Sequence, residues 1–433
     1  MSDGTGAYKY GVLGAGRQGT AAAYDLAVRG EAESVVLADV DGTRAEASAA
    51  RVNRLAGSEI ATGVALDASD SRALLAFLKP LDAAIGAISY KLNLGFTEAA
   101  IEAKTNWCDL GGNTAVVLGQ LALDKRAKKA GVRIVPDCGE APGLASNLMA
   151  YAMSLLDEPE DLVLLDGGLP LHPTPPWNYR LTFSMDGLTN EYAGGSTYIR
   201  DGKTVEVASF DPAEYELVDL GEPVGMLEAF STGGASTTPW TLGKRLRSMR
   251  NKVVRYPGHV VVWKGFMEAG LFSEVPVRVG DHDVVPRALF HALIEPQIRA
   301  DDKVDDIVIA HVIVTGRNAG EPTRAVVDMR VVRDRKLGFS AMEETTGWHA
   351  AIVAHLMASG RIAVGAAPVE LATDSAEMVA ELRARDFPIT ETVEPIETTA
   401  PIEATEPAES TEPAESNESA AGAETPDTIE PAD

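Results

Sequence analysis

Three glycines near the start of the chain have the spacing of a dinucleotide-binding loop. Gly14, Gly16 and Gly19 follow an apolar run, residues 10–13, and precede an alanine-rich helical stretch, residues 20–29. In such a loop the first glycine makes the tight turn, the second lets the backbone approach a pyrophosphate, and the third lets the helix pack closely on the sheet. The pyrophosphate would lie on the helix N-terminus, whose free N–H groups favour an anion. This context predicts a dinucleotide site rather than an ordinary glycine turn.

Asp39 indicates whether the dinucleotide is NAD or NADP. It follows the next apolar run and lies 25 residues after Gly14. A carboxylate at this place accepts hydrogen bonds from the adenosine ribose hydroxyls and repels a 2′-phosphate. The next residue is Val40 and not an arginine, which favours NAD as the cofactor. Because Arg44 lies nearby, NADP remains the minority alternative.

Polar residues near the ends of two later apolar runs are candidates for the reacting end of the site. The runs, residues 83–88 and 107–110, lead to Tyr90 and Asp109. Parallel strands bring their carboxyl ends to one edge of the sheet, so we expect these side chains near a nicotinamide ring. Tyr90 could stack on that ring, donate to a substrate, or merely cover the edge. Asp109 could bind a substrate ammonium, move a proton, or cap a loop, because a buried carboxylate needs a partner. Gly111 would let the backbone approach the ring.

Three more residues complete the candidate site. Glu140 follows the sixth apolar run at the start of a helical stretch, where it could do acid–base chemistry or simply complement the helix dipole. Arg255 could hold a substrate carboxylate with two parallel hydrogen bonds. His259 lies in a loop-like segment, where a histidine is more often structural than catalytic. We expect no metal ligands, and Cys108 and Cys138 are best explained as small buried side chains.

The elements that must position these residues indicate an α/β fold with two parts. Up to residue 143, apolar runs alternate with helical stretches, one of them at 118–130, which predicts a Rossmann doubly wound parallel sheet. Residues 144–340 contain strand-like stretches, including 179–185 and 260–263, and a hairpin signal at Asp201-Gly202. We expect a mixed, mainly antiparallel α+β domain for substrate binding and dimerisation.

The last part of the chain divides into helices and a polar tail. Residues 341–388 predict helices that pack back on the first domain. From residue 389 to the end, proline, glutamate, threonine and serine dominate, and the segment TEPAES occurs twice. Such a composition has too little apolar surface to offset the entropy of ordering, so residues 389–433 are expected to be disordered.

Charge and composition exclude several classes of protein. The net charge is −26, and the 13 acids between Glu391 and Asp433 leave −13 for residues 1–390, so nucleic acid is not an expected partner. The 2 cysteines exclude a disulfide framework. We find no apolar leader and no run long enough to span a membrane, which favours the cytoplasm. Strand edges in the second domain favour a homodimer or homotetramer.

Motifs spread over both domains resemble those of the saccharopine dehydrogenase family, and their order is most similar to its lysine 6-dehydrogenase branch. They include GAGRQG, ISY, DLGG, RYPGH and TTGWHAAIVAHLMASG, and the similarity covers roughly residues 8–372. The resemblance implies an NAD(P)-linked oxidoreductase acting on an amino-acid C–N bond. It implies these cofactor-binding residues: Gly14, Gly16, Arg17, Gln18, Gly19, Asp39, Asp67, Ser89 and Gly111. It implies these substrate contacts: Tyr90, Asp109, Arg255 and His259.

The leading hypothesis is NAD-dependent oxidation of the ε-amino group of L-lysine, followed by hydrolysis of the iminium to a semialdehyde that cyclises. An ammonium group, with a pKa of about 10.4, must lose a proton before a hydride can leave the neighbouring carbon. The candidates for that acid–base role are Tyr90, Asp109, Glu140 and His259. One alternative is oxidation of saccharopine or of another amino acid or diamine. Another is a non-catalytic dinucleotide-binding sensor or scaffold.

Overall fold

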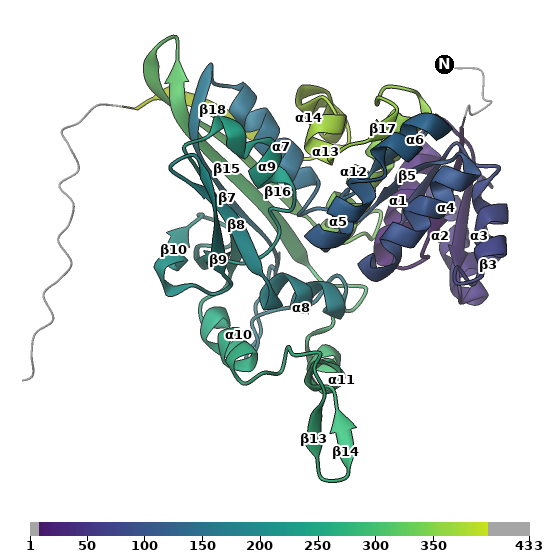
Figure 1. Ribbon diagram of the computed structural model, residues 1–433, viewed down its shortest axis with the longest axis horizontal. Helices are drawn as coiled ribbons and strands as arrows, with labels where there is room; N and C mark the ends of the chain where they lie inside the picture. The colour runs from purple at the N-terminus through teal and green to yellow at the C-terminus, as the bar shows by residue number, and fades with distance from the viewer. Residues whose placement is uncertain (1–7, 397–433) are drawn as a thin grey trace, which may run out of the picture. The chain divides into compact units, whose positions relative to one another are not determined.

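The computed structural model describes residues 8–396, which contain two large sheets joined by helices (Figure 1). The first sheet is parallel throughout, with the strand order β17-β6-β5-β4-β1-β2-β3. Its strands are β1 (Tyr8–Leu13), β2 (Ala32–Asp39), β3 (Ala61–Ala65), β4 (Ala83–Gly86), β5 (Asn106–Asp109), β6 (Arg133–Val135) and β17 (Gly365–Ala366). This arrangement confirms the predicted Rossmann sheet, to which the late strand β17 adds an edge.

Helices cover both faces of this sheet because its strands are apolar on both sides. They are α1 (Arg17–Arg29), α2 (Gly42–Ala56), α3 (Ser71–Leu78), α4 (Asn93–Ala103), α5 (Thr114–Leu121) and α6 (Asp124–Ala130), with the short 3-10 helix η1 at Tyr90–Leu92. Asp70 caps α3, since its carboxylate accepts from the backbone N–H groups of Arg72 and Ala73.

The second sheet is mixed and mainly antiparallel, as predicted. Its order is β10-β11-β12-β7-β15-β16-β18, with β8 and β9 attached at β12, and only β12 and β7 run parallel. The strands are β7 (Glu158–Pro170), β8 (Gly195–Arg200), β9 (Lys203–Ala208), β10 (Glu216–Asp219), β11 (Met226–Ser231), β12 (Ser248–Arg255), β15 (Asp306–Asn318), β16 (Glu321–Val332) and β18 (Ile389–Pro395). The predicted hairpin at Asp201-Gly202 joins β8 to β9.

Further helices and one small hairpin complete the domain. The helices are α7 (Leu144–Ser154), α8 (Met185–Ala193), α9 (Thr238–Thr241), α10 (His259–Glu268), α11 (Pro286–Ile298), α12 (Ala341–Ala358), α13 (Val369–Ala372) and α14 (Ser375–Arg383), with 3-10 turns η2 (Pro212–Glu214) and η3 (Gly243–Arg245). The hairpin consists of β13 (Val277–Val279) and β14 (His282–Val284).

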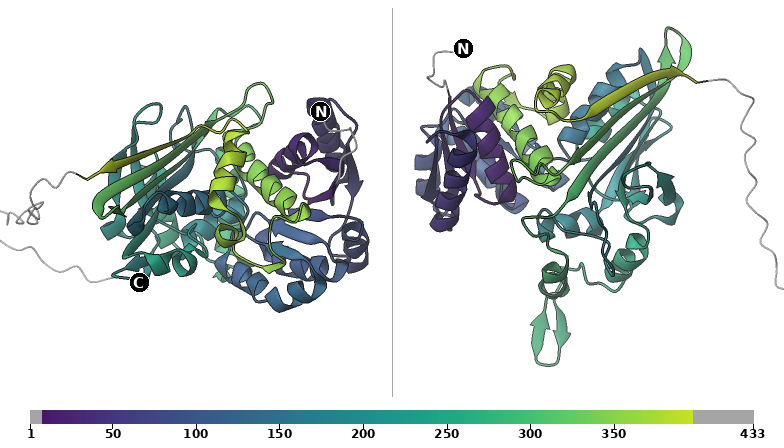
Figure 2. Two further views of the ribbon diagram at one scale, coloured as in Figure 1. Left: turned by 90° about the horizontal axis from the view of Figure 1, so that it is seen from above. Right: turned by 180° about the vertical axis from the view of Figure 1, so that it is seen from behind.

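Helix α12 joins the two sheets. It packs along α1, against β4 and β5, and also against β15 (Figure 2). Its first turn is tied to β15, because the Asp306 carboxylate accepts from the N–H groups of Ala341 and Met342 at 2.8 and 3.2 Å. Gly347 allows the close contact with α1, since a Cβ there would lie 2.8 Å from the carbonyl oxygen of Gln18. Of the late helices, α12 thus packs on the parallel sheet and α1, whereas α13 and α14 lie mainly against α7.

Four local predictions are wrong, three of them because tertiary contacts override the pattern. Residues 118–130 form two helices, since the chain turns at Leu123 and the Asp124 carboxylate accepts from Ala366 N, at the edge strand β17. Residues 179–185 are not a strand, and Met185 instead opens α8. Residues 260–263 belong to α10, whose buried His259 and Trp263 are one helical turn apart.

The fourth error concerns the start of the polar tail. Residues 389–395 form β18, which pairs with β16 along its whole length, although the sequence predicts disorder from residue 389. Most of its side chains are exposed, so backbone hydrogen bonds rather than apolar burial hold it, and composition does not reveal such bonds. Residues 397–433 lie outside the described part of the chain.

Candidate functional site

The glycine loop has the geometry that a bound pyrophosphate requires. Gly14 has φ +101°, and a Cβ there would meet the Ala87 backbone. A Cβ on Gly19 would collide with the carbonyl oxygen of Gly14, so only glycine lets α1 approach the loop this closely. A Cβ on Gly16 would meet nothing within 4 Å, and no side chain caps α1. The first N–H groups of α1 are thus open to an anion, and the residues present fit a dinucleotide.

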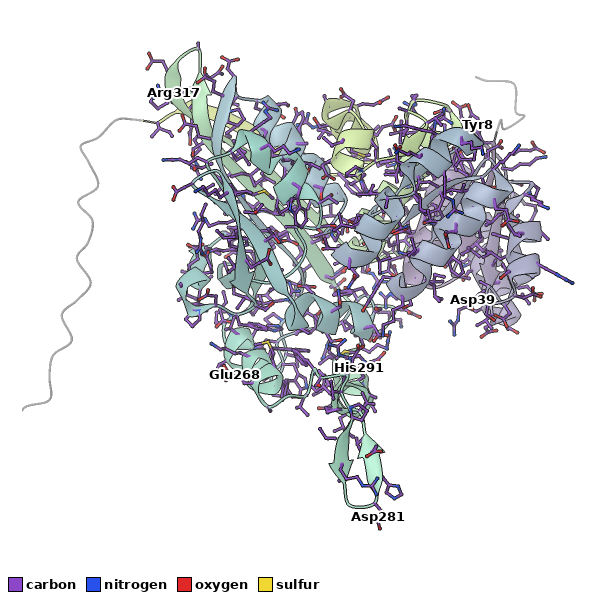
Figure 3. The ribbon with its side chains drawn as sticks, viewed as in Figure 1. Tyr8, Asp39, Glu268, Asp281, His291 and Arg317 are labelled. Carbon is purple, nitrogen blue, oxygen red and sulfur yellow. The ribbon has the colours of Figure 1, made fainter. Side chains whose placement is uncertain are left out.

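Asp39 lies at the carboxyl end of β2 beside this loop (Figure 3). Its Oδ2 accepts from the N–H of Ala15 at 3.0 Å and its Oδ1 from the N–H of Asp41 at 3.0 Å, which holds the carboxylate in one orientation. The guanidinium of Arg44 is 3.9 Å away and largely exposed. The site thus contains both a carboxylate suited to ribose hydroxyls and a cation that could meet a 2′-phosphate.

The other expected cofactor residues divide into two groups. Asp67, Ser89 and Gly111 lie beyond the carboxyl ends of β3, β4 and β5, at the same edge as the glycine loop. Arg17 and Gln18 use their side chains elsewhere. Arg17 donates to Glu343 Oε1 at 2.7 Å, and Gln18 donates to the carbonyl oxygen of Thr182 at 2.9 Å. These two side chains tie the loop to the rest of the fold, so the backbone of the loop is what remains for a cofactor.

Asp109 makes structural hydrogen bonds. It is fully buried, and its carboxylate accepts from Gln120 Nε2 at 2.6 Å, from Gly111 N at 2.9 Å and from Trp107 Nε1 at 3.2 Å. Because both oxygens already have donors, this geometry favours the loop-capping alternative over contact with a substrate ammonium.

Tyr90 lies over Gly112, at the edge where a nicotinamide is expected. A Cβ on Gly112 would be 3.4 Å from its ring, and its hydroxyl is 3.4 Å from Asn190 Oδ1. Asn190, in α8, also donates to the carbonyl oxygen of Gly112 at 2.5 Å and accepts from Asn113 Nδ2 at 3.2 Å. Burial raises the pKa of Tyr90, so its hydroxyl stays protonated and acts as a donor.

A second group of polar side chains is buried around Arg255, at the end of β12. Its Nε donates to the Tyr192 hydroxyl at 3.1 Å, its Nη1 donates to the carbonyl oxygen of Val254 at 2.9 Å, and its Nη2 lies 3.6 Å from Glu191 Oε1. His259 Nε2 is 2.9 Å from the same Tyr192 hydroxyl. Arg255 and His259 are thus brought together through Tyr192, and both are almost completely buried.

Three carboxyl groups share this environment. Burial, together with Asp166 and Glu191, raises the pKa of Glu140 well above its usual range, while Arg255 acts in the opposite direction. Burial and Glu191 raise the pKa of Asp166 to about 7, again against Arg255. Burial also raises the pKa of Glu191, and Arg255 offsets part of that rise. We call Glu140, Asp166, Glu191 and Arg255 the acidic cluster.

Several polar atoms of this region have no partner among the described residues. They are Glu140 Oε1, Asp166 Oδ1, His259 Nδ1 and the Tyr179 hydroxyl. Buried polar atoms without partners are costly and are therefore rare, so their concentration in one place indicates a ligand site. Burial and the nearby Arg255 hold the pKa of His259 well below its usual range, so the imidazole is neutral and is a weak base.

Sequence reasoning missed several of these residues. Asp166 directly follows four apolar residues within β7. A single acidic residue after such an apolar run was the one feature of the sequence that could have marked it as a site residue. Glu191 and Asn190 lie on α8, in a stretch for which no helix was predicted. Asp137, at the strand end after β6 that the sequence places near the nicotinamide, has a buried oxygen without a partner among the described residues, and burial raises its pKa to about 8, against the hydrogen bond from Ser236.

His349 was missed as a positioning residue for the loop that carries Glu140. Its Nδ1 lies 2.9 Å from the carbonyl oxygen of Cys138 and its Nε2 2.9 Å from Asn147 Oδ1. Burial lowers the pKa of His349 to about 4, so its imidazole is neutral and has a single N–H, which the Cys138 carbonyl oxygen can accept to hold this loop against α12.

Two negative findings concern the described residues 8–396. No three side chains of histidine, cysteine, aspartate or glutamate are grouped so that they could hold a metal ion. No helix in this range is both long and apolar enough to cross a membrane.

Comparison with known proteins gives consistent results for both domains. Residues 11–135 match the family model described as the saccharopine dehydrogenase NADP binding domain, and residues 139–386 match the saccharopine dehydrogenase C-terminal domain. A curated relative, saccharopine dehydrogenase [NADP(+), L-glutamate-forming] of Pyricularia oryzae, is 24% identical over 234 residues, which are 51% of this chain and 50% of the relative. The match thus spans about half the length of that relative.

One solved structure supports the architecture. The apo saccharopine dehydrogenase (L-Glu forming) from Saccharomyces cerevisiae has a TM-score of 0.71 with this chain at 17% identity, covering 89% of this chain and 100% of that one. At this identity the likeness establishes the shared fold.

Proposed function

Because this chain belongs to the saccharopine dehydrogenase family, we propose that it is an amino-acid oxidoreductase that oxidises the ε-amino group of L-lysine with NAD. The observation that carries the choice of substrate is the acidic cluster, in which the buried carboxyl groups of Glu140 and Asp166 and the partly buried one of Glu191 lie around the buried Arg255. With all four groups ionised the cluster has an excess of negative charge. A substrate that brings more positive than negative charge therefore fits it best.

The residues from the second domain suit the amino-acid head group. Arg255 can hold the α-carboxylate, because the ion pair that its guanidinium makes within 4 Å, with Glu191 at 3.6 Å, is a long one and leaves room for a closer partner. Asp166 and Glu191 flank it from β7 and α8 and can accept from the α-ammonium group. The aromatic rings of Tyr179, Tyr192 and Trp263 close the region against water and strengthen these interactions.

Glu140 suits the acid–base role at the other end of the substrate. It comes from the loop after β6, at the sheet edge where the nicotinamide would lie, whereas the rest of the acidic cluster comes from the second domain. Its raised pKa makes the carboxylate a stronger base than an exposed glutamate, so it can take the proton that the ε-ammonium must lose. Tyr90 and the neutral His259 are better suited to form hydrogen bonds that position other groups than to take up a proton.

The cofactor would be held by the glycine loop, the start of α1 and Asp39, and when bound it supplies the acceptor for the hydride. The fixed carboxylate of Asp39 supports NAD. The exposed Arg44 beside it, and the NADP named for the relatives, make NADP the alternative.

A saccharopine-oxidising activity is the second candidate, because the relatives are named for it. Saccharopine would bring three carboxylates into a region where Arg255 is the only cation of the acidic cluster. Lys252, which is also buried, is already paired with Glu216 at 2.8 Å. Electrostatics therefore favours lysine over saccharopine.

Steady-state kinetics of the purified full chain tests this proposal. Reduction of NAD and of NADP should be followed with L-lysine, L-ornithine, cadaverine and saccharopine between pH 7 and pH 10. We expect lysine with NAD to give the highest kcat/KM. Turnover of saccharopine but not of lysine would establish the second candidate, and tight NADH binding without turnover of any amine would favour a non-catalytic sensor.

A further inference from the structure

A cavity of about 790 Å³ lies away from the candidate site, between α1, α12 and the end of the second sheet. Its walls are the second half of α1, the end of β16 with the connection to α12, the side of α12, and residues 385–388 before β18. Helices α1 and α12 lie side by side here (Figure 2). The glycine loop is at the other end of α1, which is about 20 Å long at 1.5 Å per residue, so the cavity is separate from the dinucleotide site. A volume of this size accommodates a metabolite.

Basic side chains outnumber acidic ones in the walls of this cavity. The six basic residues are Arg29, Arg330, Arg333, Arg335, Lys336 and Arg385, and the four acidic ones are Asp25, Asp334, Glu344 and Asp386. The chain as a whole has the opposite balance, with a net charge of −26. A hollow whose walls have an excess of one sign of charge concentrates ions of the other sign. The cavity therefore favours an anion.

Half of the basic side chains are available to such an anion. Three of the six already pair with acids of the fold, each at 2.8 Å. The other three, Arg29, Arg333 and Lys336, have no acidic partner within 4 Å among residues 8–396. Arg29 comes from the end of α1, and the other two come from the connection after β16, so they approach the cavity from two elements. An anion between them would supply the negative charge that the fold itself does not.

Two buried side chains of α12 add hydrogen-bond donors. Glu344 and Trp348 are four residues apart, so they lie on one face of the helix, and both line the cavity. They are 4% and 7% exposed, and neither Glu344 Oε1 nor Trp348 Nε1 has a hydrogen-bond partner among residues 8–396. Burial and three nearby acids raise the pKa of Glu344 to about 9, so at pH 7 its carboxyl group is protonated and can donate, as can the indole N–H. Buried donors without acceptors indicate a ligand rich in oxygen acceptors.

From the cavity, its unpaired cations and its two buried donors we infer a binding site for a small anionic metabolite with two or more carboxylate or phosphate groups. The buried Glu344 and Trp348 would donate to one group of this ligand, and the more exposed Arg29 and Lys336 would hold another. No member of the acidic cluster lines the cavity. The inference is therefore independent of the proposed oxidation of lysine.

Isothermal titration calorimetry of the full chain tests the site, with citrate and inorganic pyrophosphate as the probes. Saturating NADH should be present in every titration, because pyrophosphate could otherwise bind at the glycine loop. We expect one anion to bind per chain at low salt, with a dissociation constant below about 1 mM. The probe that binds more tightly shows whether the natural ligand is a polycarboxylate or a phosphate compound.

Two variants examine the named contacts. Arg29→Gln/Lys336→Gln removes two unpaired cations and should weaken binding of the tighter probe by at least about tenfold. Arg72→Gln/Lys203→Gln is the matched control, because Arg72 and Lys203 are also exposed and without an ion pair among residues 8–396, but lie outside the cavity, and the change in net charge is the same. Trp348→Phe removes the indole N–H, keeps an aromatic ring, and should weaken binding by about three- to tenfold.

Two results would overturn the inference. One is the absence of detectable binding of either probe to the wild type at about 10 mM. The other is binding that Arg29→Gln/Lys336→Gln weakens no more than the matched control does, because the change in net charge would then account for the whole effect. Circular dichroism should show that each variant is folded before it is titrated.

Discussion

Replacing Asp166 with asparagine should remove a large part of the pH dependence of stability. Asp166 is buried in β7, its Oδ1 has no partner within residues 8–396, and burial with Glu191 raises its pKa to about 7 against the influence of Arg255. An aspartate in an unfolded chain has a pKa of about 3.9. The folded chain thus holds this proton over a pH range in which the unfolded chain releases it.

The sign and size of the effect follow from this difference. Below about pH 4 both states hold the proton, so Asp166 has no effect on the pH dependence of stability. Between about pH 4 and pH 7 only the unfolded chain ionises, so the free energy of unfolding falls by about 1.4 kcal/mol per pH unit, or about 4 kcal/mol in all. Above about pH 7 both states are ionised and the loss is constant. Asparagine does not titrate and avoids this loss.

Urea unfolding of the wild type and of Asp166→Asn at pH 5 and pH 8 measures the effect. The free energy of unfolding of the variant, relative to the wild type, should rise by about 3 kcal/mol between these two pH values. Asp201→Asn is the control, because Asp201 is exposed in a tight turn that also suits asparagine, and it should show no such rise. The same stability difference between variant and wild type at both pH values would refute the reasoning.

The same variant tests the acid–base role of Glu140. Since the charge of Asp166 helps to raise the pKa of Glu140, removing that charge should move the acidic limb of the kcat/KM profile to lower pH. A limb that does not move, in a variant that is still active, would mean that Glu140 is not the group that titrates.

Four further substitutions test the site. Glu140→Gln should lower kcat by about 10² to 10⁴ with little change in KM, as measured by steady-state kinetics, and an unchanged kcat would exclude Glu140 as the base. Asp39→Asn should lower the ratio of kcat/KM for NAD to that for NADP by about tenfold or more, whereas Arg44→Ala should raise it if NADP competes at this site. Gly19→Ala should destabilise the fold by about 1–3 kcal/mol and abolish dinucleotide binding, because its Cβ would collide with the Gly14 carbonyl group; calorimetry and NAD titration should detect both losses.

Local patterns were sufficient for the first sheet and its loop. A strand, a glycine turn and a helix follow one another within about 30 residues, so Gly14, Gly16 and Gly19 could be placed without knowledge of the rest of the chain. The same holds for the hairpin at Asp201-Gly202, where two adjacent residues determine the turn. Patterns failed where distant contacts decide the conformation, as at Asp124, which bonds to Ala366.

The acidic cluster could not be predicted as a unit, because its members come from four separate elements. Glu140 follows β6, Asp166 lies in β7, Glu191 lies in α8 and Arg255 ends β12. Each is an ordinary charged residue in its local segment, and the raised pKa values of the three carboxyl groups result chiefly from burial, modified by the charges of other members of the cluster. The dinucleotide site thus follows from neighbours along the chain, whereas the proposed choice of amine depends on charges that only folding brings into one buried space.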